Sequence, residues 1–161
     1  MLEAPALPLD SFCRLPRRKF LALASGCLLC GAAGVPTVRA GTDRPIDVGT
    51  LHDYPRDEIS EKYIEYDIFV IRNQRRLFAA TAICPHKANA LLLSPKDPRL
   101  IICSGHESRF NPEGIPVGGQ ARRALVRHAI SVNERSRVIV DTSRKFLQPE
   151  WDDKASYVVI G

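Results

Sequence analysis

The sequence ICPHKANALLLSPKDPRLIICSGHESRF, residues 83–110, contains two short runs that each pair a cysteine with a histidine. The first run is Cys84-Pro85-His86. The second, Cys103-Ser104-Gly105-His106, begins after sixteen intervening residues. Each run follows an apolar stretch typical of a strand and opens a segment of turn-forming residues. Two thiolates and two imidazoles, presented by two loops, are a typical set of metal ligands.

Three interpretations of these four residues are open at this point. A single zinc ion takes the same ligand atoms, although zinc motifs usually place cysteine with cysteine and histidine with histidine along the chain. A disulfide between Cys84 and Cys103 is the ordinary expectation for two cysteines in an exported protein. A dinuclear iron–sulfur centre, with both cysteines on one iron and both histidines on the other, fits the mixed order best.

The motif resembles the Rieske iron–sulfur domain. The likeness extends over residues 46–141, and residues 84–121 carry the most specific motifs of that family. It implies an all-β fold, an antiparallel β-sandwich with a small subdomain of cluster-binding loops, and one [2Fe–2S] cluster per chain. It also implies that two cysteines bind the inner iron and two histidines bind the outer iron at an exposed tip. These four metal ligands are Cys84, Cys103, His86 and His106.

The segment after the second histidine also matches the family, with informative departures. The run from Ser108 to Asn111 is similar to the family's S-x-[YF]-D, which implies that Ser108 and Phe110 lie beside the cluster without binding metal. Phe110 stands where many members have a tyrosine hydroxyl that donates to a cysteine sulfur. Hydrogen bonds to sulfur stabilise the reduced cluster, so we expect a potential below the top of the Rieske range.

A second departure concerns the link between the two loops. High-potential members of the family carry one extra cysteine in each loop, joined as a disulfide. The matching positions here are Asn89 and Gly105. Both cysteines are missing together, so the resemblance implies the disulfide-free type, whose loops are held by packing and hydrogen bonds.

Three short matches indicate a subgroup. Lys87 follows the first histidine, where members from cytochrome bc complexes usually have leucine, and the third loop reads Gly119-Gln120-Ala121. Together with the Ser-Arg-Phe run, these residues are similar to the small subunit of arsenite oxidase. The resemblance implies the iron–sulfur subunit of an exported oxidoreductase complex. The alternatives are a Rieske subunit of a quinol–cytochrome c reductase and a zinc-stabilised exported binding domain.

The expected role is one-electron transfer. Four protein ligands and the bridging sulfides satisfy both irons, so we expect no catalytic residues in this chain. The expected partner is a larger redox subunit, either a molybdopterin enzyme or a cytochrome b/c complex, with soluble cytochrome c or quinol as further candidates. Residues 41–161 carry 18 basic and 16 acidic residues, which gives no reason to expect nucleic-acid binding.

The first forty residues read as a targeting segment. Arg17-Arg18-Lys19-Phe20-Leu21 precedes a mildly apolar stretch rich in small residues, which ends at Val38-Arg39-Ala40. This pattern is typical of an export signal, and the paired arginines resemble a twin-arginine signal, whose pathway exports folded proteins. We therefore expect a signal or N-terminal anchor in residues 1–40, a Rieske domain in residues 41–161, and a periplasmic protein. An uncleaved signal would attach it to the membrane.

The remainder of the chain reads as short strands. Alternating apolar residues predict a hairpin of residues 63–72 and 77–83 around Asn73-Gln74, and a late hairpin of residues 125–132 and 137–141. Further strands are expected at 45–49, 99–103 and 157–160, and residues 84–123 otherwise read as loops.

Several other residues receive structural interpretations. His52 and His128 are expected to be ordinary surface or strand histidines, and Trp151 an anchor for the C-terminal segment. Three arginines near the loops form a candidate docking patch, for which solvated surface charge is the simpler explanation; they are Arg109, Arg122 and Arg123.

Overall fold

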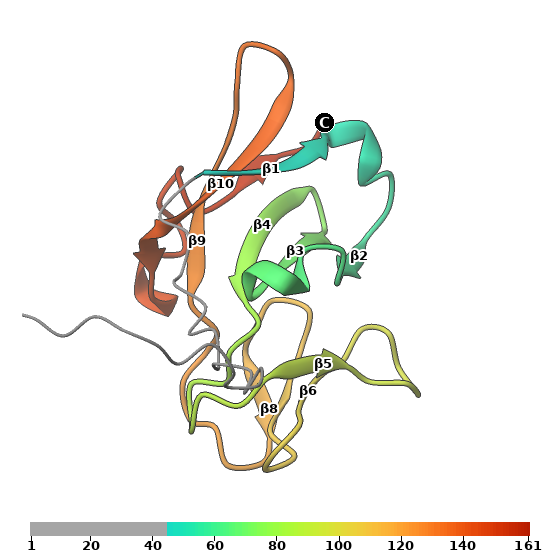
Figure 1. The fold of residues 1–161 in the computed structure, drawn as a ribbon, viewed down its shortest axis with the longest axis vertical. Helices are drawn as coiled ribbons and strands as arrows, with labels where there is room; N and C mark the ends of the chain where they lie inside the picture. The colour runs from blue at the N-terminus through green and yellow to red at the C-terminus, as the bar shows by residue number, and fades with distance from the viewer. Residues whose placement is uncertain (1–44) are drawn as a thin grey trace, which may run out of the picture. The chain divides into compact units, whose positions relative to one another are not determined.

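The structure, a computed structural model, describes residues 45–161. The predicted export signal in residues 1–40 lies outside the described residues. From residue 45 onward the chain forms eleven β-strands and three short 3-10 turns, with no α-helix (Figure 1). None of the helical turns in this part has the length and apolar character that crossing a membrane requires. The predicted all-β class is confirmed.

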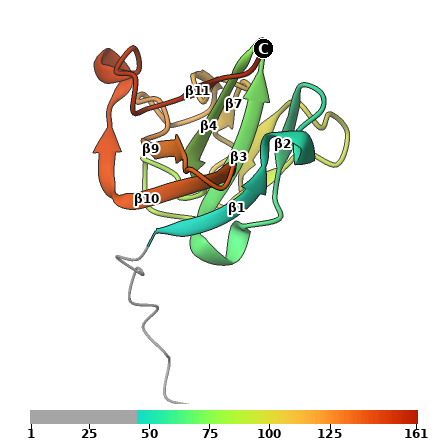
Figure 2. The same ribbon diagram turned by 90° about the horizontal axis from the view of Figure 1, so that it is seen from above.

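Seven strands form the larger sheet, in which every pairing is antiparallel. Six follow the order β1-β10-β9-β4-β3-β2, and β11 pairs with β4. Figure 2 shows β1 along β10 and β2 beside β3, at opposite edges of this sheet. The bounds are β1 (Ile46–Thr50), β2 (Glu58–Ser60), β3 (Ile68–Asn73), β4 (Arg76–Thr81), β9 (Arg127–Val132), β10 (Arg137–Phe146) and β11 (Val158–Val159).

Four shorter strands form a second antiparallel sheet in the order β5-β6-β7-β8. They are β5 (Leu91–Leu93), β6 (Ile101–Cys103), β7 (Arg109–Phe110) and β8 (Pro116–Gly118). Figure 1 shows this sheet at the end of the molecule away from the β9–β10 turn. The 3-10 turns are η1 (Leu51–Asp53), η2 (Ile64–Tyr66) and η3 (Gln148–Glu150).

Strand β3, which lies between β4 and the edge strand β2, is buried on both faces. Its first four residues, Ile68 to Ile71, are at most 1% exposed, and alternate side chains enter two different clusters. Phe69 packs in the cluster that contains Phe110 of the smaller sheet, whereas Val70 packs with Val48 and Val140 of the larger sheet. Because its side chains enter both clusters, β3 joins the two halves of the core. Burial of each such side chain contributes about 1.5–3 kcal/mol to the stability of the fold.

The strand predicted for residues 63–72 begins later than the alternation suggests. Ile64–Tyr66 form the turn η2, and Asp67 has a left-handed backbone with φ of 59° before β3 starts. The prediction was wrong for residues 63–67, because the apolar alternation continues through a 3-10 turn that is not part of any strand. The hairpin itself is confirmed, with its turn between β3 and β4 at residues 74–75.

The smaller sheet contains structure that the sequence pattern did not reveal. The strand predicted at 99–103 is confirmed as β6, but β5, β7 and β8 were expected to be loops. These strands have only two or three residues each, too few to display a period of two. The expected loops are therefore the shorter segments before, between and after these four strands.

The late hairpin is confirmed as β9 and β10, and β10 runs on to Phe146 through a register shift after Asp141. Beyond it, Trp151 is 8% exposed and packs with Phe146 and Ala124. The guanidinium of buried Arg127 lies 3.9 Å from the Trp151 ring and 3.7 Å from the Phe78 ring. These contacts fasten the C-terminal segment to the larger sheet, as expected for Trp151.

Candidate metal centre

The structure brings the four predicted ligands together at the end of the smaller sheet. Cys84 lies three residues beyond the end of β4, next to the isolated bridge between Ile83 and Ala90, and Cys103 is the last residue of β6. Each cysteine opens a short loop that contains the histidine of its run. We call residues 84–89 the first ligand loop and residues 103–108 the second ligand loop.

The two ligand loops share one backbone design. In the first, the Cys84 N–H donates to the Asn89 carbonyl at 2.8 Å. In the second, the Cys103 N–H donates to the Ser108 carbonyl at 2.8 Å. The fifth residue of each loop has a left-handed backbone, with φ of 53° at Ala88 and 52° at Glu107. The loops differ in the place of the histidine, which is third in one and fourth in the other.

The two thiols are free and lie side by side in the interior. Cys84 is 2% exposed and Cys103 is 4% exposed, and no disulfide joins them. The Cys84 thiol donates toward the Cys103 sulfur. The disulfide interpretation is therefore not what the structure contains.

Backbone N–H groups of both ligand loops point at these sulfur atoms. Burial raises the pKa of the Cys84 thiol, against hydrogen bonds from the N–H groups of His86 and Lys87. Burial acts in the same direction at Cys103, but N–H groups of Gly105 and His106 and the neighbouring Cys84 thiol lower the pKa of that thiol overall. Donors of this kind favour sulfur in its charged, metal-binding form.

The two imidazoles form a second pair, at the surface. His86 and His106 are both exposed, and their ring centroids are 5.1 Å apart with the planes at 83°, edge to face. Within residues 45–161, no three His, Cys, Asp or Glu side chains gather in the way that holds a single ion. The donors lie as thiol beside thiol and imidazole beside imidazole. This arrangement fits a centre that binds one iron through sulfur and another through nitrogen.

The residues predicted to flank the cluster are buried below the second ligand loop. Ser108 and Phe110 are each 0% exposed. The Ser108 Oγ accepts hydrogen bonds from the backbone N–H groups of Gln120 and Ala121 at 3.1 and 3.0 Å. Its own hydroxyl proton remains available for donation, because an oxygen that accepts twice still carries its hydrogen.

The third loop needs glycine where it crosses the second ligand loop. Gly119 has φ of 83°, and a Cβ there would lie 2.5 Å from the Ser108 Cα and 2.6 Å from the Glu107 carbonyl oxygen. No side chain fits so close to backbone atoms. The third loop is thereby held directly against the ligand loop.

Exposed basic residues occur in the first ligand loop and in the third loop, one of which contacts the first ligand loop. Lys87, Arg122 and Arg123 are exposed, and the Arg123 guanidinium donates to the Pro85 carbonyl of the first ligand loop at 3.1 Å. Arg109 is also exposed, on β7 beside Gly118. We call Lys87, Arg122 and Arg123 the basic rim.

Sequence reasoning missed the part played by two residues. Asn89 places its side-chain nitrogen 3.2 Å from Nδ1 of His106, so it reaches from the first ligand loop to the second. A signal for this contact was available, because the resemblance aligns Asn89 and Gly105 with two cysteines that form a disulfide between these loops in other members. Arg127, for which the sequence carried no signal of burial, is 4% exposed.

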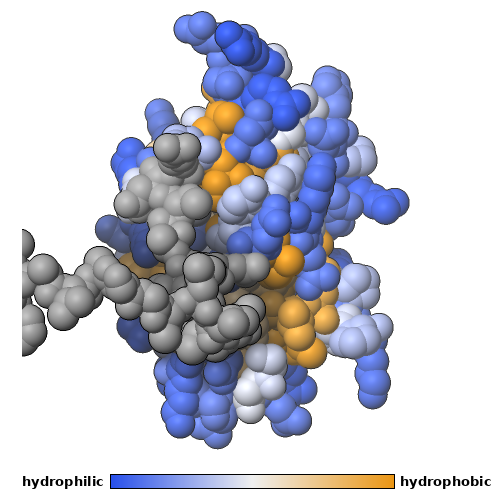
Figure 3. Space-filling model, in the orientation of Figure 1, coloured by the Kyte–Doolittle hydropathy of each residue, from blue (hydrophilic) through white to orange (hydrophobic). Residues whose placement is uncertain are grey.

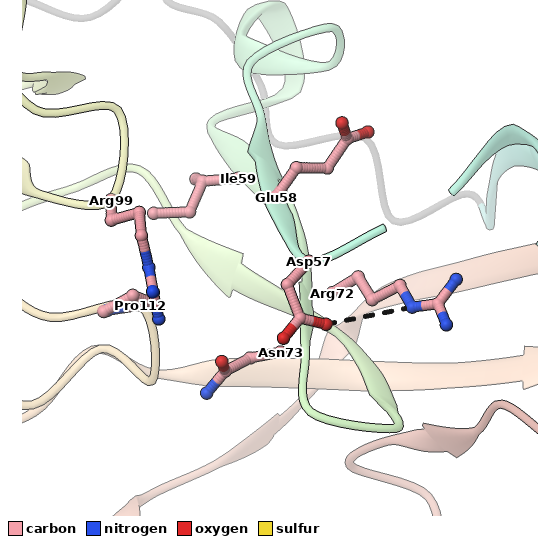
Figure 4. Close-up of a pocket in the computed structure, with 7 residues that line it drawn as sticks. All are labelled: Asp57, Glu58, Ile59, Arg72, Asn73, Arg99 and Pro112. Carbon is pink, nitrogen blue, oxygen red and sulfur yellow. Dashed lines mark ion pairs between the residues drawn. The ribbon is translucent and has the colours of Figure 1, made fainter. Parts of the chain in front are cut away.

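A small hollow elsewhere on the surface involves none of the predicted ligands. It lies between β2, β3 and the turns near Arg99 and Pro112, and Figure 4 shows Asp57 paired with Arg72 across part of it, at 3.9 Å. Charged and polar side chains line most of this hollow. The four predicted ligands therefore remain the candidate site.

Comparison with known families agrees with this geometry. The family model for the Rieske [2Fe-2S] domain matches residues 45–139, which is more than half of the chain. No curated protein matches the sequence. The matched range contains both ligand loops, the third loop, the smaller sheet and the larger sheet up to the start of β10. The chain therefore belongs to the Rieske [2Fe-2S] domain family, and its domain binds a [2Fe-2S] cluster that serves electron transfer.

Proposed function

We propose that Cys84 and Cys103 bind one iron of the cluster and that His86 and His106 bind the other. The observation that carries this proposal is the contrast in burial between the two pairs. The thiols are nearly inaccessible, whereas the imidazoles stand at the surface. Thiolate and imidazole pairs of this kind are the ligands that distinguish the Rieske centre from clusters bound by four cysteines.

The surroundings of the metal centre differ between its sulfur side and its histidine side. When bound, the cluster takes up and releases one electron at a time. The core around Cys84 and Cys103 keeps water from the sulfur ligands, and backbone N–H groups of both loops stabilise negative charge there. The exposed His86 and His106 form the short route through which a docked partner exchanges electrons.

The chain acts, in this proposal, as the iron–sulfur subunit of an exported oxidoreductase complex, similar to the small subunit of arsenite oxidase. The charged residue after the first histidine supports this choice over a quinol-oxidising complex. Lys87 is exposed beside His86, where an apolar residue would suit a quinol ring. The twin-arginine pattern in residues 1–40 supports export of the folded protein.

The partner is a larger redox subunit with an acidic face. Three cations of the basic rim flank the exposed histidines, so opposite charge on the partner would steer docking onto the electron-transfer route. Exposed apolar residues adjoin this end as well, because Ile83 is 38% and Leu92 is 46% exposed. Figure 3 shows apolar areas of this kind within a mostly hydrophilic surface.

The experiment that tests the proposal is spectroscopy of the exported holoprotein. We expect visible absorption that bleaches on reduction, and about two irons with two acid-labile sulfides per chain. Voltammetry should give a potential below the upper limit of about +300 mV for Rieske centres, because Phe110 has no hydroxyl to donate to sulfur. A colourless protein that contains zinc would overturn the proposal.

The assignment to a complex has its own test. Affinity purification from the native membrane and periplasmic fractions should recover a larger subunit that contains molybdopterin. Recovery of a cytochrome b in its place would assign the chain to a quinol-oxidising complex.

A further inference from the structure

Asn89 connects the two ligand loops. Its backbone carbonyl closes the first loop by accepting the Cys84 N–H. Its side chain crosses to the second loop, where Nδ2 lies 3.2 Å from Nδ1 of His106. The side chain therefore bridges the two loops beside a predicted nitrogen ligand of the metal centre.

Gly105 provides the space that this side chain occupies. A Cβ at position 105 would lie 2.0 Å from Nδ2 and 2.8 Å from Cγ of Asn89. The backbone of Gly105 is not left-handed, in contrast with Gly114 and Gly119. Glycine is therefore required at this position for space and not for backbone conformation. The Asn89 side chain of one loop therefore fills the space left by the missing side chain of Gly105 in the other.

The two residues are also spaced as a covalent link would be. The Cβ of Asn89 lies 3.6 Å from the ideal Cβ position of Gly105. Disulfides have Cβ–Cβ distances of about 3.5–4.5 Å. The loops therefore approach as closely as a cross-link would bring them, with an amide contact in its place.

We propose that Asn89 is a positioning residue that clasps the second ligand loop onto the first and directs an N–H donor at the ligands of the metal centre. The inference rests on the proposed ligand set. The packing of Asn89 on Gly105 holds the loops at a fixed separation. The amide N–H beside His106 favours the more negative, reduced state of the bound cluster.

Two substitutions separate packing from donation. Asn89→Ala removes both, and Asn89→Asp keeps the shape but replaces the N–H donor with an acceptor. We expect the alanine variant to lose its cluster about tenfold faster under an iron chelator, the effect of one or two lost hydrogen bonds. We expect the aspartate variant to show a lower reduction potential in voltammetry, because the N–H donor beside His106 has become an anion. Ser131→Ala, an exposed position on β9 outside both ligand loops, is the control and should behave as the wild type.

A third variant tests the geometry without using the cluster. Asn89→Cys combined with Gly105→Cys in the full chain should form a disulfide, detected by mass and by thiol titration in protein freed of iron. In the loaded protein, this pair should retain the cluster at least as long as the wild type.

The results distinguish the two proposals. A wild-type protein without iron would overturn the proposed function, while cross-linking of the cysteine pair would still support the contact between the loops. A wild-type protein with a cluster, together with unchanged retention and unchanged potential in both Asn89 variants, would overturn the clasp. Failure of the Asn89→Cys and Gly105→Cys pair to form a disulfide would also overturn the proposed contact between the loops.

Discussion

The larger sheet and the smaller sheet have different roles in this molecule. The larger sheet has one strand, β3, that is buried on both faces, and it contains none of the predicted ligands. The smaller sheet has strands of two or three residues, and its two ligand loops present both histidines to solvent. Hydrophobic burial concentrates stability in the first region, and loops held on a stable support form the site in the second. Substitutions should therefore separate into those that remove the metal centre and those that weaken the fold.

The largest expected effect is loss of the centre. Cys84→Ser and Cys103→Ser should each abolish the visible absorption of the cluster, because serine is a poor replacement for a thiolate bound to iron. Iron analysis and absorption spectra of the purified variants measure this. His52→Ala, in an exposed turn of the larger sheet, should keep the full spectrum. A cysteine variant with an unaltered spectrum would remove that residue from the ligand set.

A smaller effect should follow where the third loop presses on the second ligand loop. Gly119→Ala places a Cβ against the backbone of residues 107 and 108, in a left-handed conformation. We expect the free energy of unfolding to fall by about 3 kcal/mol, as measured by urea denaturation. Gly161→Ala is the control, since a Cβ there meets nothing within 4 Å. Equal stability of the two variants would show that the third loop moves away from residues 107 and 108 at little cost in free energy.

The larger sheet should be sensitive to acid through His128. This residue is 6% exposed in β9, and burial together with Lys145 lowers its pKa to about 4. The unfolded state, with an ordinary value near 6.5, binds more protons between these limits. The stability that neutral His128 contributes is fully present above pH 6.5 and is lost as the pH falls toward 4.

The expected size of this acid effect is roughly 3 kcal/mol in the free energy of unfolding. Fluorescence of Trp151, the single tryptophan, follows unfolding in urea at pH 7.5 and pH 4.5. His128→Gln should remove most of the difference between the two pH values, and His52→Gln should leave it unchanged. A pH difference that survives in His128→Gln would assign the acid sensitivity to other groups.

The smallest effect concerns the basic rim. Lys87→Gln combined with Arg122→Gln should slow electron transfer to the anion ferricyanide about threefold at low ionic strength, through weaker attraction. The difference should disappear in about 1 M salt, where charges are screened within about 3 Å. Arg135→Gln, in the β9–β10 turn at the other end of the molecule, is the control (Figure 1). Stopped-flow measurements that show no dependence on salt would argue against a docking role for the rim.

The sequence predicted the parts of this molecule that follow from short-range rules. The pairing of a cysteine with a histidine, first at Cys84 and His86 and again at Cys103 and His106, led to the metal centre because ligand chemistry is visible in residue identity. The hairpins of the larger sheet were predicted because their strands are long enough to show alternation. The start of β3 was misplaced because Asp67, left-handed and exposed, interrupts an apolar pattern without changing it.

The contacts between loops could not be predicted in the same way. Burial of Arg127 depends on two aromatic rings far away in sequence, Phe78 and Trp151. The contact of Asn89 with Gly105 depends on the distance between two loops, which no periodicity encodes. Such features arise from tertiary packing and are visible only when separate segments are brought together.

The matched closure of the ligand loops has a consequence for how this chain tolerates change. In each loop the cysteine N–H bonds the carbonyl five residues later, with a left-handed residue just before the closing one. Replacement of an exposed residue such as Ser104 leaves that closure intact. Insertion or deletion of a single residue shifts the closing carbonyl and moves a cysteine or a histidine off its target. Exposed loop residues that do not serve the metal centre can therefore be substituted, whereas the number of residues in each loop is fixed.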